Sequence, residues 1–262
     1  MIYKKGSKGE VVKQIQTALH LTPDGLFGSV TEQAVKEYQR KNGLVVDGIV
    51  GEKTLSLLLP KPQEETFITK GYINTHITRL ANRPIKYIAI HYTAGSTSRK
   101  GAAMSTRNVF LQPKRKASAD FVVDDETIVQ INPDLRNYYC WSVGDAKNRT
   151  TGGGRLYGIA TNRNTISIEI CSNLKKGGNA AYPNHDGWYY TDASLENARK
   201  LVRDLMAKYN VPKSNVVRHY DISGKMCPGI VGWNDAPTYT DEGKQTGKRN
   251  SSQQWLNFFN SI

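Results

Sequence analysis

The first 60 residues place apolar side chains at the spacing of an α-helix. One apolar face is formed by residues three or four positions apart, namely Val11, Val12, Ile15, Ala18 and Leu19. A second face is formed by Ala34, Val35 and Tyr38. A repeat close to 3.6 residues puts such side chains on one stripe of a helix, which packs against a neighbour. The pattern therefore predicts amphipathic helices around a small core.

An internal repeat adds a third helix to this segment. Residues 24–31 read DGLFGSVT, and residues 47–54, which lie 23 positions later, read DGIVGEKT. Each Asp-Gly pair is typical of a turn with a residue at positive φ, and the residues after the second glycine begin a helix. We therefore expect a small three-helix all-α domain over residues 1–60.

β-branched and aromatic runs of strand length follow in the rest of the chain. Before them, two prolines and a polar run between Pro60 and Glu65 predict a linker over residues 61–70. Five strands are expected, over 85–92, 119–124, 127–132, 165–172 and 215–220. Helical spacing returns after Asp192, which could cap a helix, and again from Trp255 to Ile262. Residues 71–262 are therefore predicted to form an α/β domain, with a mixed central sheet of about five or more strands flanked by helices.

Three long segments of this second domain are rich in Gly, Asn, Lys and Thr, and they cover residues 142–164, 173–190 and 223–250. Such composition predicts loops at the rim of the sheet. Loops of this length are often functional, so the rim is where we expect a binding site.

The formal net charge of +13 points to an anionic partner, such as a wall polymer, a nucleic acid or a membrane surface. Residues 1–60 hold eight Lys/Arg and six Asp/Glu, a net +2, so most of the excess lies in the second domain. Its densest basic cluster runs from Arg99 to Lys116. A solvated basic face is the simpler interpretation of this cluster. No groove-reading module accompanies it, so we expect no nucleic-acid partner.

No apolar run approaches the roughly 18 residues that a membrane helix needs, and residues 1–6 lead into no signal core. We therefore expect a chain without a leader, made in the cytoplasm and without stable membrane insertion. Three cysteines are too few for a disulfide framework. Cys140 and Cys171 are expected to be buried thiols that pair only if the fold brings them together.

Two histidines at the ends of apolar runs, and one cysteine, are candidate metal ligands. His91 is predicted to end a buried strand, a second strand ends in His219, and Cys227 follows after a turn. One strand-terminal histidine alone is more often a hydrogen-bonded structural residue. Two imidazoles and one thiolate together, however, are a ligand set of catalytic zinc sites, in which water takes the fourth position.

The segments around these residues resemble the type-2 N-acetylmuramoyl-L-alanine amidases, which are bacterial and phage cell-wall lytic enzymes. The resemblance covers most of residues 70–235 and includes the stretches IAIHYTAG (88–95), SADFVVD (118–124), WSVG (141–144), NTISIEI (164–170) and HYDISGKMCP (219–228). It implies one zinc ion, Zn2+, on His91, His219 and Cys227, with Glu169 and Lys225 as the catalytic pair. Many relatives have His at Ser142 and at Asp120, but neither difference removes an implied zinc ligand.

The two implied catalytic residues suit the chemistry of amide hydrolysis. Alternation along the strand places Ser167 and Glu169 on one face, where a carboxylate could take a proton from water and return it to the leaving amine. Lys225 could offset negative charge on the carbonyl oxygen, while zinc polarises that carbonyl. The alternatives are an ion-paired or surface strand glutamate and a solvated turn lysine.

The N-terminal segment has a resemblance of its own. Residues 6–9 (GSKG), Val12 and Gln16, followed by the two Asp-Gly-x-x-Gly-x-x-Thr units, are similar to the three-helix peptidoglycan-binding module. This resemblance implies a tether that keeps the second domain close to an insoluble polymer. It assigns no binding residues, because the Asp and Gly positions are explained equally well as turn formers.

Together the two resemblances imply hydrolysis of the amide between N-acetylmuramic acid and L-alanine of the peptidoglycan stem peptide. The alternative is a non-catalytic peptidoglycan recognition protein on the same fold, against which the intact ligand set and catalytic pair argue. We expect a monomer that acts on the bacterial cell wall, either as a phage endolysin or after export by another route. Trp141 could stack on substrate or anchor a core, and His20, His76 and His185 are expected to be structural or surface residues.

Overall fold

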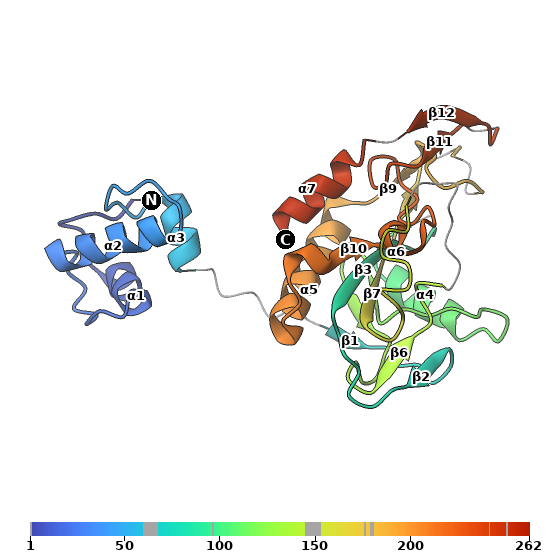
Figure 1. Cartoon of the computed structure of the whole chain (residues 1–262), viewed down its shortest axis with the longest axis horizontal. Coiled ribbons are helices and arrows are strands. Elements are labelled where there is room, and N and C mark those ends of the chain that lie inside the picture. The colour runs from blue at the N-terminus through green and yellow to red at the C-terminus, as the bar shows by residue number, and fades with distance from the viewer. Residues whose placement is uncertain are drawn as a thin grey trace. The chain divides into compact units, whose positions relative to one another are not determined.

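The computed structural model describes residues 2–59, 68–95, 97–144, 153–175, 177–178, 181–240, 242–249 and 251–262. The chain divides into two compact units, Met1–Glu65 and Thr66–Ile262 (Figure 1). Most of the linker predicted over residues 61–70 lies outside the described residues. Parts of the three predicted loops, over 142–164, 173–190 and 223–250, also lie outside them.

Three helices form the N-terminal unit: α1 (Glu10–Ala18), α2 (Ser29–Lys41) and α3 (Glu52–Leu58). Each begins directly after a glycine and carries a glutamate in its first turn, where a negative charge stabilises the helix dipole. Their apolar stripes meet in one core, made of Val12, Ile15, Phe27, Val35, Val50 and Leu58. The predicted three-helix fold is therefore confirmed.

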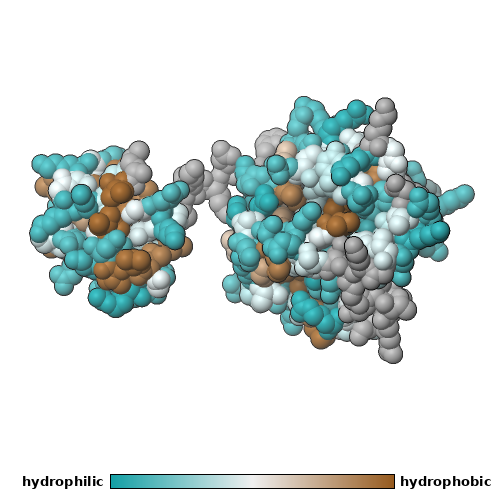
Figure 2. Space-filling model, turned by 90° about the horizontal axis from the view of Figure 1, so that it is seen from above, coloured by the Kyte–Doolittle hydropathy of each residue, from teal (hydrophilic) through white to brown (hydrophobic). Residues whose placement is uncertain are grey.

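Apolar side chains also reach the surface of this unit, where Figure 2 shows them gathered in patches. The large exposed ones are Ile2, Leu26, Val30, Val45, Val46 and Leu57. A small domain that leaves contiguous apolar surface in water often uses it for binding.

A buried glutamine closes the first turn of the sequence repeat. The side-chain nitrogen of Gln16 donates to the carboxylate of Asp24 at 2.7 Å and to the carbonyl of Leu26 at 3.0 Å. It also lies 3.1 Å from the hydroxyl of Thr31, and its oxygen accepts the N–H of Gly25 at 2.8 Å. Because its polar atoms are all bonded, this side chain ties α1 to the turn and to α2.

The second turn repeats the arrangement. Gln39 donates to the carboxylate of Asp47 at 2.8 Å, to the carbonyl of Ile49 at 2.9 Å and to the hydroxyl of Thr54 at 3.3 Å. Its oxygen accepts the N–H of Gly48 at 2.9 Å. The repeat in the sequence is therefore a repeat of one buried hydrogen-bond pattern, in which the aspartates and glutamines hold the fold.

A six-stranded sheet forms the centre of the C-terminal unit, in the order β1, β5, β4, β7, β3, β10 (Figure 1). The strands are β1 (Ile68–Lys70), β3 (Tyr87–Tyr92), β4 (Phe121–Val123), β5 (Ile128–Gln130), β7 (Thr165–Ile170) and β10 (Val216–Arg218). β4 and β5 are antiparallel, and the other neighbours are parallel. The predicted mixed sheet is confirmed. β1 lies inside the predicted linker (residues 61–70), where its three residues give too short an alternation to be read as a strand.

Helices cover both faces of this sheet. α5 (Asp192–Tyr209) and α7 (Gln253–Ser261) contribute to the core on one face, and α4 (Ala102–Phe110) contributes to the core on the other. On β4, Phe121 and Val123 point into the first core and Val122 into the second, as the pleat requires. The 3-10 turn η1 (Lys213–Asn215) precedes β10, and the short helix α6 (His219–Ser223) follows that strand.

Short strand pairs lie outside the central sheet. They are β2 (Ile77–Arg79) with β6 (Tyr138–Cys140), β8 (Asn173–Leu174) with β9 (Trp188–Tyr189), and β11 (Pro237–Tyr239) with β12 (Gln245–Arg249). The last two pairs occupy segments for which only loops were predicted, because such short strands give no periodic signal. Within the described part of the chain, every helix is too short or too polar to cross a membrane.

The predicted cap of α5 was wrong by one position. Asp192 is the first residue of the helix, and Thr191 is the cap. The Thr191 hydroxyl accepts the N–H of Ser194 at 3.1 Å, which satisfies a donor that the first helical turn would otherwise leave free.

A fully buried ion pair joins Arg83 to Asp120, with Nη1 and Oδ1 3.1 Å apart. The other guanidinium hydrogens are directed at backbone carbonyls, among them those of Tyr138 and Asn162. Asp120 also accepts the N–H of Ser167 at 2.8 Å. Since both charges are well hydrogen-bonded, the pair stabilises the sheet where β4 meets β7. Asp120 is thus a core residue.

Candidate metal centre and catalytic groove

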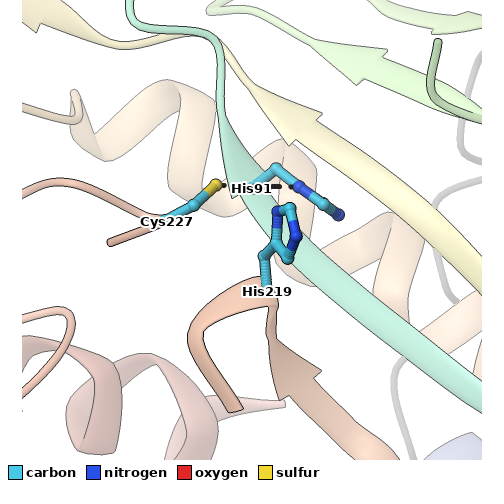
Figure 3. A group of neighbouring side chains, drawn as sticks. All are labelled: His91, His219 and Cys227. Atoms are coloured by element: carbon cyan, nitrogen blue, oxygen red, sulfur yellow. Dashed lines mark hydrogen bonds between the residues drawn. The ribbon is translucent and has the colours of Figure 1, made fainter. Parts of the chain in front are cut away.

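β3 and β10 are neighbouring parallel strands, so their carboxyl ends meet at one edge of the sheet. His91 lies near the end of β3, and His219 follows β10 directly as the first residue of α6. The strand predicted over 215–220 was too long, because the Asp221 carboxylate accepts the N–H of Arg218 at 2.9 Å and starts a helix there. Cys227 follows α6 in the next turn, so that the three side chains gather at one point (Figure 3).

The donor atoms of these three side chains form a compact group. The Nδ1 of His91 lies 3.6 Å from the Sγ of Cys227, and the ring centroids of His91 and His219 are 4.7 Å apart. Each residue offers one donor atom, and these atoms lie within 4.8 Å of one another. All three residues are buried. Two imidazoles and one thiol at this separation suit a tetrahedral metal ion with one open position.

A backbone carbonyl fixes the tautomer of His219. Its Nε2 lies 2.7 Å from the carbonyl oxygen of Val143, so Nε2 carries the hydrogen and Nδ1 keeps its lone pair. The Val143 backbone is held in turn, because its N–H and that of Ser142 both donate to the Oδ1 of Asn162, at 2.9 and 3.0 Å. Such support orients a metal-ligating imidazole.

Burial sets the protonation of the three groups in the absence of a metal. Burial and the neighbouring His219 lower the pKa of His91 well below its usual value. Burial and the charge of Lys225 lower the pKa of His219 to about 4. Burial, reinforced by Glu169, raises the pKa of Cys227 to about 12. Both imidazoles are therefore neutral at pH 7, as metal ligands must be, and the thiol ionises only if a cation binds it.

Three buried side-chain nitrogen and oxygen atoms have no hydrogen-bond partner among the residues that the structure describes. They are His91 Nε2, His219 Nδ1 and Glu169 Oε2. An unpaired buried polar atom costs about 1–3 kcal/mol, so such atoms are rare in native proteins. All three residues line the same groove, as expected where a further group is to be bound.

Glu169 lies on β7 directly beside His91 of β3. Burial raises the pKa of its carboxyl group to about 7, and the positive charges of Lys225 and Arg115 oppose that rise. Lys225 is exposed and lines the same groove. A carboxylate with a pKa near neutrality can both take and return a proton, which is what a general acid and base requires.

The groove has a volume of about 410 Å³. Its wall beyond the five predicted site residues includes Phe110, Arg115, Ala117, Ser118, Trp141, Pro183 and Met226. Trp141 is 39% exposed, and its indole N–H donates to the hydroxyl of Thr78 at 2.8 Å. It is therefore a surface of the groove and not the anchor of a core. Arg115, counted with the solvated basic cluster in the sequence, lines the groove as well.

The other histidines and cysteines lie outside this groove. His20 is exposed, and the Nδ1 of His76 lies 2.9 Å from the carbonyl of Phe110. His185 is buried and accepts the N–H of Gly187 at 3.0 Å. Cys140 and Cys171 are buried free thiols, so the fold does not join them in a disulfide.

The residues that hold the candidate ligands in place were not predicted from the sequence. Val143 was noted only as part of a motif, and its carbonyl is the feature that matters. Arg218 and Asp221, which flank His219, form a buried ion pair at 2.7 Å. Opposite charges three residues apart around a candidate ligand were the available signal, but such pairs are common on helix surfaces.

Comparisons with known proteins place the same segments in two families. The family model of N-acetylmuramoyl-L-alanine amidases (Amidase_2) matches residues 81–230, and the model of a peptidoglycan-binding domain (PG_binding_1) matches residues 8–58. N-acetylmuramoyl-L-alanine amidase CwlH of Bacillus subtilis (strain 168) is 34% identical over 142 residues, which are 54% of this chain and 46% of the relative. For XlyA of the same organism, the match is also 34% over 142 residues, or 54% of this chain and 39% of the relative.

Among solved structures, that of the catalytic domain of XlyA is 28% identical and covers 75% of this chain and 99% of that chain, with a TM-score of 0.48. The chain spans less than half the length of the two curated relatives. The amidase family match covers more than half of the chain and contains His91, Glu169, His219, Lys225 and Cys227. This chain therefore belongs to the N-acetylmuramoyl-L-alanine amidase family (Amidase_2) and carries a peptidoglycan-binding domain before the amidase domain.

Proposed function

We propose that this protein hydrolyses the amide bond between N-acetylmuramic acid and L-alanine of the peptidoglycan stem peptide. The observation that carries the proposal is the grouping of His91, His219 and Cys227, whose donor atoms lie within 4.8 Å of one another in a groove that Glu169 also lines. Family membership supports it, because curated relatives bear the name of this activity.

One zinc ion is the proposed cofactor, held by His91, His219 and Cys227. The donor set fits, because two neutral imidazoles and a thiol that can ionise on binding are typical zinc ligands. The unpaired Nδ1 of His219 is already fixed as a lone-pair donor by the Val143 carbonyl. When bound there, zinc supplies a Lewis acid that polarises the scissile carbonyl and increases the acidity of water.

Glu169 is the proposed general base and acid. Among the described residues its Oε2 has no hydrogen-bond partner, and Glu169 lines the groove, so this oxygen is the proposed acceptor of a proton from the attacking water. The carboxylate takes the proton of that water and returns it to the nitrogen of the leaving amine. Burial, which raises the pKa of this carboxyl group above its usual value, favours a group that holds the proton between the two transfers.

Lys225 is the proposed stabiliser of the carbonyl oxygen. It stands two positions before Cys227 and its exposed side chain lines the groove. An ammonium aimed at a carbonyl oxygen becomes more favourable as negative charge develops during attack. Its effect should therefore appear in the chemical step more than in substrate binding.

The N-terminal unit is the proposed tether to bacterial peptidoglycan. Its exposed apolar side chains, gathered in patches, supply surface for binding (Figure 2). Attachment to the polymer raises the local concentration of the catalytic unit without any change in the groove. We propose that the protein works as a monomer on the cell wall, in the manner of a phage endolysin.

Mass spectrometry of purified muropeptides tests this function. The zinc-loaded protein is expected to release free stem peptides that begin with alanine, and Glu169→Ala should abolish their release. Intact muropeptides that bind to the protein would contradict the amidase assignment and favour a non-catalytic recognition protein. Release of peptide at an unchanged rate by Glu169→Ala would instead contradict only the role of Glu169.

A further inference from the structure

Arg218 stands directly before the candidate ligand His219 and is almost fully buried. Its Nε and Nη2 donate to the two carboxylate oxygens of Asp221, at 2.9 and 2.7 Å. Its Nη1 donates to the carbonyl of Trp233 at 3.1 Å and to the hydroxyl of Ser252 at 3.0 Å. One planar guanidinium thus joins α6 to the segment that leads into α7.

Two aromatic rings enclose the same guanidinium. Its central carbon lies 5.3 Å from the ring centroid of Tyr220 and 5.4 Å from that of Trp255, within the range of cation–π attraction. Ser252 directly precedes α7, and its side chain accepts from Arg218 and makes no capping hydrogen bond to the first turn of the helix. The start of α7 is therefore organised around Arg218.

This contact reaches both ligands that follow Arg218. His219 is the next residue in the chain, and the N–H of Tyr220 donates to the carbonyl of Cys227 at 2.9 Å. A displacement of Arg218 would therefore move His219 through the backbone and Cys227 through Tyr220. His91, which lies on β3, would keep its place.

The partners of Arg218 around the start of α7 lie outside the part of the chain that the amidase family model matches. That match ends at residue 230, whereas Trp233, Ser252 and Trp255 follow it. We propose that α7 and the segment before it position the metal ligands His219 and Cys227, and that Arg218 is the positioning residue that couples them. This inference rests on the proposed zinc site.

If Arg218 only stabilises the fold, its replacement should lower the unfolding temperature without a specific loss of zinc affinity. If it positions the ligands, zinc affinity should fall. A variant at Arg199 serves to distinguish these two roles. Arg199 of α5 also contacts α7, because its Nε donates to the Ser261 hydroxyl at 2.8 Å and its guanidinium lies 5.7 Å from the Phe258 ring. These contacts are at the opposite end of α7 from Ser252. Arg199→Lys is thus the matched control for Arg218→Lys, since both replace the fork of an arginine by a single ammonium.

The test is competition for zinc between the full-length protein and a chromophoric chelator, followed by visible spectroscopy of the cobalt(II)-substituted protein. Arg218→Lys should weaken zinc binding by about 10-fold and change the cobalt spectrum, because losing a direct partner of a ligand costs about 10- to 100-fold and Arg218 acts on the ligands through the backbone. Ser252→Ala should act in the same direction by a smaller factor. Arg199→Lys should leave both zinc affinity and the cobalt spectrum as in the wild type, even where it lowers the unfolding temperature.

Equal zinc affinities in Arg218→Lys, Arg199→Lys and the wild type would overturn the inference, and so would equal weakening in the two variants. If Arg218→Lys does not fold, the zinc affinity of Ser252→Ala is compared with that of Arg199→Lys instead. Ser252→Ala should fold, because it removes only one hydroxyl, and equal zinc affinities in these two variants would overturn the inference. Failure of the wild type itself to bind zinc would contradict the proposed zinc site, and that outcome is distinct from unchanged affinity in the variants.

Discussion

Buried polar side chains differ between the two units of this chain in whether their hydrogen bonds are complete. In the N-terminal unit, Gln16 and Gln39 are 2% and 1% exposed, and their amide groups are fully bonded. Around the groove of the C-terminal unit, His91, His219 and Glu169 each have one buried atom without a hydrogen-bond partner in the described part of the chain. Completed hydrogen bonds indicate residues that hold a fold, and incomplete ones indicate residues kept for a group that binds later.

The contrast does not depend on the domain, because the C-terminal unit contains both kinds of residue. Arg83 and Asp120 are as buried as any residue of the groove, yet their charges meet each other and nearby carbonyls and N–H groups. Glu169 lies on β7 two positions after Ser167, whose N–H donates to Asp120, and its Oε2 has no such partner among the described residues. Substitutions in the groove should therefore lower activity, whereas substitutions of the fully hydrogen-bonded residues should lower stability.

The largest effect is expected for Glu169→Gln. An amide keeps the shape of the carboxyl group but cannot accept the proton, so kcat/KM for muropeptide hydrolysis should fall by about 10²- to 10⁴-fold. Because burial disfavours the charged carboxylate, stability towards urea should not decrease. Glu126→Gln is the control, since Glu126 forms only an exposed ion pair with Lys100 at 3.2 Å, and it should retain the wild-type rate. Wild-type kinetics in Glu169→Gln would remove this residue from the mechanism.

The next largest effect is expected for Arg83→Met, and it concerns stability. Breaking the buried pair leaves the Asp120 carboxylate without its counter-charge, which should lower the free energy of unfolding by about 3–5 kcal/mol. Replacing both partners, as in Arg83→Met with Asp120→Leu, should recover part of that loss. Urea unfolding monitored by tryptophan fluorescence measures both. A stable Arg83→Met variant that has lost activity would assign this pair to catalysis and break the contrast.

A smaller effect is expected for Gln16→Ala and for Gln39→Ala. Each substitution removes the amide side chain that bonds one Asp-Gly turn. Each should lower the free energy of unfolding of the N-terminal unit by about 1–3 kcal/mol, by a similar amount at the two repeats. The exposed Gln14 and Gln33 on the same helices provide matched alanine controls. Scanning calorimetry measures the unfolding, and hydrolysis of a soluble muropeptide should proceed at the wild-type rate. Unequal losses at the two sites would show that the repeats are not equivalent in energy.

The smallest effect is expected from pH. The N–H of Leu26 and the amide of Gln16 hold the pKa of Asp24 below its usual value, and Ile49 and Gln39 do the same for Asp47. A pKa lowered by folding contributes stability above the unfolded pKa, and this contribution is lost as the pH falls through the folded value. The N-terminal unit should therefore unfold at lower temperature in acid.

Replacing both aspartates by asparagine keeps an acceptor in each turn and removes the titration. The unfolding temperature of this double variant, followed by calorimetry in acid, should depend less on pH than that of the wild type. An identical pH dependence would show that these two carboxylates do not account for the acid sensitivity.

Local motifs could be read from the sequence, and contacts between distant segments could not. The histidine at the end of each apolar run, the cysteine after the turn and the two Asp-Gly turns depend on neighbours in the chain, and the structure brings His91, His219 and Cys227 together. The supports of the site depend on tertiary contact. Val143 meets His219 across 76 residues, and Arg218 meets Ser252 across 34.

Short elements were missed for a related reason. β1, β8 and β9 have two or three residues each, and so contain less than one readable period of alternation. Their pairing comes from the strands beside them and from the packing of the core, which act only once the chain has folded. Arg83 shows the same limit, because nothing near it in the sequence predicts that a charged side chain will be buried.

X-ray absorption spectroscopy at the zinc edge tests most directly whether His91, His219 and Cys227, whose donor atoms lie within 4.8 Å of one another, form a metal centre. We expect one zinc per chain, with one sulfur at about 2.3 Å and two imidazole nitrogens at about 2.0–2.1 Å. Cys227→Ser should remove the sulfur signal. A zinc spectrum without sulfur in the wild type, or no stoichiometric binding of zinc, would contradict the account.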